Sequence, residues 1–112
     1  MELHKLFENQ YKQLEETVDE IAERIGKLGE KTIGTMQEFL KFSLIKESPG
    51  KYSLSKDMIK ELLEDHETVI IQLRKDIDGC TEKSKDAGTA DFLAGLMEQH
   101  ETTVWVLRRY LN

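Results

Sequence analysis

The sequence predicts an all-α protein, an antiparallel helical bundle with three long helices and one short connecting helix. Three observations lead to this prediction. Apolar residues recur every three or four positions through most of the chain, which is the period of an amphipathic helix. The 112 residues include one proline and seven glycines, so few positions would interrupt a long helix. Valine, isoleucine and the aromatic residues are too scattered to form regular strands.

The first half of the chain predicts one long and one short helix. The long helix is expected from about Glu2 to Leu28, with Gly29 as its C-cap. A short amphipathic segment follows at residues 35–42, and the stretch KESPGKYS at 46–53 is a loop. The apolar residues of the long helix share one face: Leu3, Phe7, Leu14, Val18, Ile21, Ala22 and Ile25.

The second half of the chain predicts two further long helices. One is capped by Ser53 or Ser55 and ends at about Ile77, before Asp78-Gly79. The other runs to Leu111 from an N-cap at Thr89. Four long helices commonly close an antiparallel bundle, and this chain is one short of that number. The expected buried residues are Met58, Leu62, Leu63, Val69, Ile70, Leu73 and Ile77, then Phe92, Leu93, Leu96, Met97, Val104, Leu107 and Leu111.

These two later helices resemble each other in sequence. LLEDHETVIIQLRKDI at 62–77 is similar to LMEQHETTVWVLRRYL at 96–111, at a constant offset of 34 residues. That period is typical of tetratricopeptide repeats, but their signature is missing and the rest of each unit does not match. We therefore interpret the similarity as two similarly built helices of one bundle.

Composition narrows the classes of partner and compartment. The formal net charge is −6, and an acidic surface repels phosphate backbones, so weak or no DNA binding is expected. Cys80 is the only cysteine, which precludes an intrachain disulfide and suits a reducing cytosol. No apolar run approaches membrane length, and the N-terminus has no signal-peptide core. We expect a cytoplasmic protein with no membrane partner.

Polar residues that can bind metal follow one edge of the first helix. With His4 at zero on a helical wheel, Glu8, Asp19 and Glu23 fall at about 40°, 60° and 100°. The apolar residues occupy the adjoining sector. A carboxylate is costly to place beside a core unless it has a partner, and a cation is a suitable one. His4 with Glu8, and Asp19 with Glu23, are each one helical turn apart and can present two ligands together.

A second copy of the chain would complete the ligand set. His4 and Asp19 are about 22 Å apart along the helix and cannot share an ion within one chain. If two copies of the helix pair antiparallel across a two-fold axis between Gln13 and Leu14, His4 faces Glu23 and Glu8 faces Asp19. This homodimer has two equivalent sites. Mixed imidazole and carboxylate ligands favour iron, manganese or zinc over calcium. The alternative is a solvated helix face with ordinary Glu8–Lys12 pairing.

The same residues carry a resemblance to a known family. LHKLFE (3–8) and VDEIAERIGKLG (18–29) resemble the two signatures of the Dps family, miniferritins that protect DNA in starved cells. GTADFL (88–93) and HETTVWVLRRYL (100–111) resemble the family's last helix. The resemblance implies a ferritin-like bundle that assembles into a hollow dodecamer, oxidises Fe(II), typically with hydrogen peroxide, and stores the ferric product inside.

The resemblance also implies roles for particular residues. His4, Asp19 and Glu23 match the family's ligand positions at a ferroxidase site on a two-fold interface, and are the expected catalytic residues. Glu8 matches an acidic position that supports the site. The expected metal ligands are therefore His4, Glu8, Asp19 and Glu23, with iron as the metal and zinc or manganese as substitutes.

The sequence departs from the family pattern in three ways. The family signature begins with a His-Trp pair about a dozen residues before the Leu-His, which would lie before Met1. We therefore expect residues 1–112 to be a single ferritin-like domain truncated at its N-terminus, without the first bundle helix. Thr32 stands where proline or alanine is usual, and the lysine-rich DNA-binding tail of some members is absent.

Three functions remain open from the sequence. The first is Dps-type iron binding, oxidation and storage in a homo-oligomer, either intact or impaired by the truncation, with the family's dodecamer or a smaller or swapped assembly as alternatives. The second is a self-associating helical bundle without metal chemistry. The third is a DNA-compacting protein, which the negative charge disfavours.

Several other residues have ordinary interpretations. His66 and His100 each lie in a His-Glu-Thr stretch and form no HExxH motif, so we interpret them as helix or interface histidines. Trp105 is expected to be a packing residue or an interface anchor. Asp86 and Asp91 precede or begin the last helix, with Asp91 as a carboxylate near its start; the family resemblance alternatively implies a place near iron-entry pores.

Overall fold

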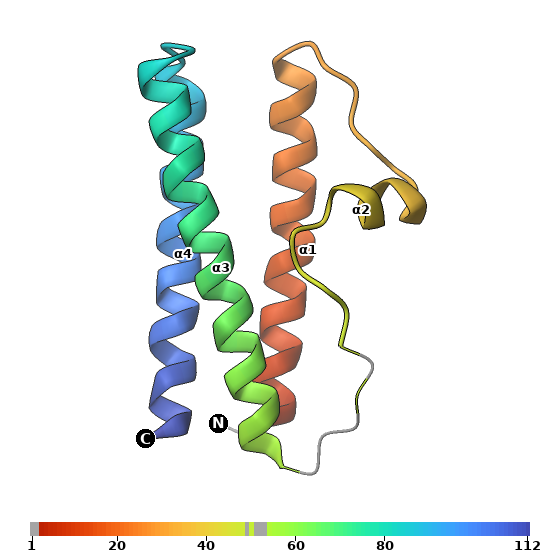
Figure 1. Ribbon diagram of the computed structural model, residues 1–112, viewed down its shortest axis with the longest axis vertical. Coiled ribbons are helices and arrows are strands. Elements are labelled where there is room, and N and C mark those ends of the chain that lie inside the picture. The colour runs from red at the N-terminus through yellow and green to blue at the C-terminus, as the bar shows by residue number, and fades with distance from the viewer. Residues whose placement is uncertain (1–2, 49, 51–53) are drawn as a thin grey trace. The chain divides into compact units, whose positions relative to one another are not determined.

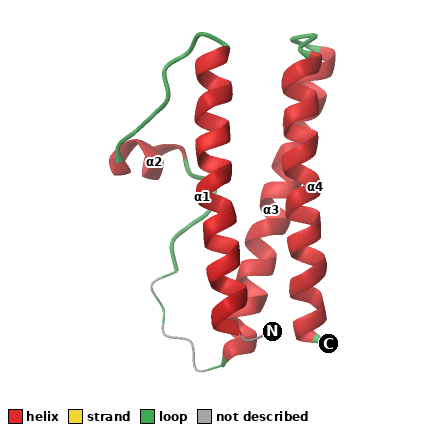
Figure 2. Cartoon of the chain, turned by 180° about the vertical axis from the view of Figure 1, so that it is seen from behind, coloured by secondary structure: helices red, strands yellow, loops and turns green. Residues whose placement is uncertain are grey.

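The computed structural model describes residues 3–48, 50 and 54–112, and these residues form helices and connecting loops without strands (Figures 1 and 2). The helices are α1 (Leu3–Lys27), α2 (Met36–Phe42), α3 (Ser55–Glu82) and α4 (Ala87–Leu111). The all-α class and the order of three long helices and one short helix are therefore confirmed. The predicted residues Glu2, Pro49 and Ser53 lie outside the described residues.

The chain forms two compact units. The first, Met1–Leu44, contains α1 and α2, and the second, Ile45–Asn112, contains α3 and α4. In the described part of the chain, no helix is both long enough and apolar enough to cross a membrane.

In the first unit, α1 ends as the sequence predicts. Gly29 has a φ of +87°, a left-handed conformation that side chains disfavour, and its N–H donates to the Gly26 carbonyl over 3.0 Å. Arg24 and Lys27 lie in the last turn, where positive charge is favourable. The expectation that the apolar face of α1 is buried is partly wrong, because Leu14, Val18 and Ile21 on that face are exposed. In the described part of this unit, α2 does not pack along α1 to cover them.

The short helix α2 is fixed by hydrogen bonds at its start. The Thr35 hydroxyl oxygen accepts from the backbone N–H of Glu38 over 3.2 Å, and the Glu38 carboxylate accepts from the backbone N–H of Thr35 over 3.1 Å. This reciprocal pair is a capping box. It explains why a helix of only seven residues, none of them buried, forms at the predicted position.

In the second unit, α3 and α4 pack side by side in opposite directions (Figures 1 and 2). The predicted residues Ile70, Leu73, Leu96, Val104 and Leu107 are buried, and the other predicted core residues of these helices are half-buried. The sequence missed two buried residues, Ile59 and His66.

The predicted boundaries of α3 are partly wrong. The helix passes through Gly79 to Glu82, and the carbonyl of Gly79 accepts from the backbone N–H groups of Lys83 and Ser84. One glycine costs a helix only about 1 kcal/mol relative to alanine, which is too little to end it here. Ser55 is the first helical residue and not the cap, which is Leu54, without a side-chain capping bond.

The start of α4 also differs from the prediction. Asp86, and not Thr89, is the N-cap: its carboxylate accepts from the Thr89 backbone N–H over 3.0 Å and from the Thr89 hydroxyl over 2.6 Å. A carboxylate is a strong cap because it also carries charge opposite to the helix N-terminus. Asp91 therefore lies a full turn into the helix, beyond the position expected for it.

We expect Asp86→Ala to lower the free energy of unfolding by about 1 kcal/mol, because it removes the capping acceptor. Denaturant unfolding followed by circular dichroism measures this loss. The matched control is Asp91→Ala, which removes an exposed carboxylate from the same helix and should change stability by less than about 0.5 kcal/mol. Equal losses in the two variants would contradict this account of the cap.

Candidate metal centre

The first pair of predicted ligands lies near the start of α1. The Nε2 atom of His4 is 3.9 Å from a carboxylate oxygen of Glu8, one helical turn away. The His4 side chain is 87% exposed, so its imidazole is open to an incoming ion. One imidazole nitrogen and one carboxylate this close can bind a single transition-metal ion together.

Glu8 also has a cationic partner on the same helix. The Nζ atom of Lys12 donates to a Glu8 carboxylate oxygen over 2.9 Å. This hydrogen bond and the charge of Lys12 hold the pKa of Glu8 below its ordinary value. The carboxylate is therefore ionised and ready to bind a cation, but a metal must compete with Lys12 for it.

The second pair, Asp19 and Glu23, lies further along α1. Both side chains are exposed, and one helical turn separates them. At the helical rise, Asp19 is about 22 Å from His4. Among the described residues, no group of three or more histidine, cysteine, aspartate or glutamate side chains is close enough to hold a metal ion. One chain thus presents the four predicted ligands as two separate pairs.

Sequence reasoning missed a contact between the two histidines of the second unit. The Nδ1 atoms of His66 on α3 and His100 on α4 are 2.8 Å apart, and their rings are tilted by 48°. Burial lowers the pKa of both imidazoles. For His66, burial and then the charge of a protonated His100 lower it to about 4. Both rings are therefore neutral at pH 7, and one Nδ1–H donates to the other Nδ1.

The signal for this contact was present in the sequence. His66 and His100 occupy the same position in the two similar segments, 34 residues apart. When similar helices pack antiparallel, equivalent positions near the crossing point come together.

We expect the protein to lose stability as the pH falls from 6.5 towards 4. The unfolded chain binds a proton at each histidine with a pKa near 6.5, whereas the folded state resists protonation of His66 down to about 4. The stability is thus complete above pH 6.5, and His66 alone contributes up to about 3 kcal/mol of it. Urea unfolding at pH 7.5, 5.5 and 4.5 measures the loss.

The control for this pH effect is the double variant His66→Gln/His100→Gln. Its amides can hydrogen-bond each other without titrating, so the loss between pH 6.5 and 4 should shrink. A pH dependence equal to that of the wild type would assign the effect to other groups.

Comparisons with known proteins agree with this architecture. Residues 1–112 match the family described as a ferritin-like domain. The structure is similar to that of Dps from Thermosynechococcus elongatus, with a TM-score of 0.92 and 33% identity over 98% of this chain and 69% of that one. Dps from Staphylococcus aureus has a TM-score of 0.91 and 32% identity, covering 98% and 72%. These matches define the class as ferritin-like.

Curated relatives narrow the class further. DNA protection during starvation protein 2 of Bacillus anthracis is 34% identical over 110 residues, covering 98% of this chain and 74% of the relative. A low temperature-induced protein of Nostoc is 43% identical over 98% of this chain. The chain spans 62% of the Nostoc protein's length. The chain belongs to the Dps family, and the predicted resemblance is confirmed.

Proposed function

We propose that this chain binds Fe(II), oxidises it and retains the ferric product, with the metal held between two copies of α1. One observation supports the proposal: two pairs of side chains that can bind metal, His4 with Glu8 and Asp19 with Glu23, each lie one helical turn apart on α1. Membership of the Dps family supports this use of them.

The donor set fits iron as the substrate. Carboxylates are hard oxygen ligands that stabilise the ferric product, while an imidazole suits ferrous iron. In an antiparallel two-fold pair of α1 helices, His4 and Glu8 of one copy would join Asp19 and Glu23 of the second. Neither pair is complete alone, so the oligomer is part of the site. Zinc or manganese would substitute for iron at the same donors.

The proposed oxidation assigns limited work to the protein. Two Fe(II) ions each give one electron to hydrogen peroxide; its O–O bond breaks, and two protons complete two water molecules. Asp19, Glu23 and Glu8 offset the positive charge gained by iron, which favours the ferric state. His4, being exposed, accepts the incoming ion. Glu8 joins once it has separated from Lys12.

The proposal extends to assembly, compartment and DNA. We propose a cytoplasmic homo-oligomer of single ferritin-like domains, either the family's dodecamer or a smaller or swapped assembly. Relatives are named for DNA protection. For this chain, the net charge of −6 supports weak or no direct DNA binding. Any protection of DNA would then come from removal of Fe(II) and peroxide.

We expect Asp19→Ala and Glu23→Ala each to weaken Zn(II) binding at least about tenfold and to slow Fe(II) oxidation, because each removes a ligand. Titration calorimetry measures the first effect, and the absorbance of the ferric product measures the second. Circular dichroism should show unchanged helicity, since both side chains are exposed.

The matched control for the ligand variants is Glu20→Ala, which removes an exposed carboxylate from another side of α1. It should leave metal affinity nearly unchanged. If Glu20→Ala weakens binding as much as Asp19→Ala, the metal responds only to the charge of the helix, and the proposed site is wrong.

We expect Lys12→Gln to tighten Zn(II) binding about two- to fivefold. The substitution removes the cation that competes for Glu8, and exposed ion pairs of this kind have modest free energies. Lys5→Gln, also an exposed lysine of α1, serves as the control for the general loss of positive charge. Equal tightening in both variants would show that Lys12 does not act through Glu8.

A further inference from the structure

The α3–α4 hairpin has internal pseudo-two-fold symmetry, as the 34-residue offset between its two similar segments suggests. At the 34-residue offset, Glu67 of α3 corresponds to Glu101 of α4, and Arg74 corresponds to Arg108. The structure contains the two reciprocal ion pairs, Arg108–Glu67 at 3.3 Å and Arg74–Glu101 at 3.5 Å. The His66–His100 contact joins the equivalent histidines. A single pseudo-two-fold axis between the helices relates all three contacts.

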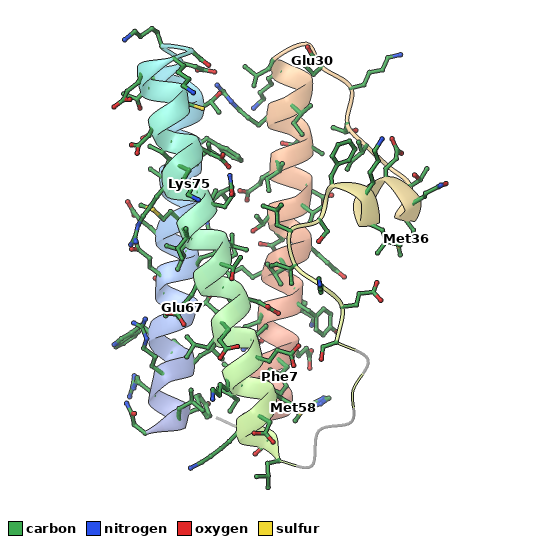
Figure 3. The ribbon with its side chains drawn as sticks, in the orientation of Figure 1. Phe7, Glu30, Met36, Met58, Glu67 and Lys75 are labelled. Atoms are coloured by element: carbon green, nitrogen blue, oxygen red, sulfur yellow. The ribbon has the colours of Figure 1, made fainter. Side chains whose placement is uncertain are left out.

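One face of the hairpin displays this symmetry to solvent. A shallow groove of about 300 Å³ runs between α3 and α4, with Ile70, Ile71 and Val104 lining it between the two ion pairs. Glu67, a residue of the groove lining on α3, is labelled in Figure 3. Ile71 is 54% exposed, and its equivalent on α4, Trp105, is 58% exposed. Two large apolar side chains are therefore exposed: Ile71 in the groove lining, and Trp105 next in sequence to the groove residue Val104, with the Arg109 guanidinium 5.1 Å from its ring centroid.

The charges at the four corners of this groove alternate. On α3 an acidic residue, Glu67, is followed two turns later by a basic one, Arg74; on α4 the antiparallel order reverses them. All four side chains are between 44% and 61% exposed, so they can contact a partner as well as each other. A partner of uniform charge would attract two corners and repel the other two.

A second copy of the same face matches all four corners. Consider two copies of this face in contact, related by a two-fold axis that lies between them and runs parallel to the helices. Each carboxylate of one copy then meets a guanidinium of the other. A two-fold axis that runs across the helices gives the same result. The apolar centre then covers the apolar centre, as an isologous contact requires. Burying Ile71 and Trp105 removes their exposed surface from water.

We propose that this hairpin face, defined by Glu67, Ile71, Arg74, Glu101, Trp105 and Arg108, is a docking surface for the same face of a second copy of this chain. The contact uses no residue of α1 and needs no metal. It is therefore independent of the iron site proposed above, and either proposal can fail without the other.

The first experiment tests the apolar centre. Ile71→Glu/Trp105→Lys changes two exposed residues and leaves the net charge unchanged. With a chelator present, light scattering should give a particle of at most half the wild-type mass, with helicity retained. Leu28→Glu/Leu54→Lys, at exposed apolar residues elsewhere, should keep the wild-type mass. An unchanged mass for the Ile71/Trp105 variant would overturn the proposal.

The second experiment tests the charge pattern. The quadruple variant Glu67→Arg, Arg74→Glu, Glu101→Arg and Arg108→Glu keeps both internal ion pairs, with their signs exchanged, and keeps the net charge. Its face still complements itself but repels the wild-type face at all four corners. Both chains also carry Val18→Glu, which disfavours association through the exposed face of α1.

Native mass spectrometry of the mixed chains then decides the outcome. Each chain should form dimers with its own kind, and mixed dimers should fall at least about tenfold below their statistical share, since like charges at an interface are strongly disfavoured. Mixed dimers at the statistical share would overturn the proposal, and so would two monomeric chains.

Discussion

The antiparallel packing of α3 against α4 is the contact on which the second unit depends. It buries Ile70, Leu73, Val104 and Leu107, and within that layer it holds two imidazoles against each other. A neutral histidine pair makes one Nδ1–H···Nδ1 hydrogen bond there, and the buried Nε2 of His66 has no hydrogen-bond partner among the described residues. A charged pair is disfavoured there, since burial penalises the protonated form. The same packing sets the spacing of the ion pairs on the hairpin surface.

The candidate metal centre differs, because helical spacing within α1 is what pairs its predicted ligands. Helical spacing alone places His4 beside Glu8 and Asp19 beside Glu23. The pairs are too far apart to act together in one chain, so any shared ion must recruit another copy. In the single chain, Lys12 forms an ion pair with Glu8 and offsets its charge. If the proposed site binds iron, the exposure of His4, Asp19 and Glu23 would let the ion enter and leave.

Much of the fold could be predicted because its signals are local. The 3.6-residue period located every helix, and Gly29 and Thr35 acted as the cap residues their types favour. The errors fell where local signals compete or are weak: Asp86 is the cap in place of Thr89, and one glycine, Gly79, costs too little to end α3. The His66–His100 contact depends on how two helices cross, which a helical wheel of either one does not contain. For the candidate site, the sequence anticipated the Glu8–Lys12 ion pair, and the assignment of His4, Glu8, Asp19 and Glu23 as metal ligands stays a prediction.

The internal two-fold of the hairpin has a consequence for how this sequence can change. Glu67 and Glu101 are held by arginines that are themselves equivalent, so a sign reversal in one pair leaves the other intact. Substitutions at positions 67 and 108 should therefore be tolerated together more readily than singly, and so should those at 74 and 101. Among relatives, position 67 would covary with position 108, and position 74 with position 101, because each pair is in contact in the structure.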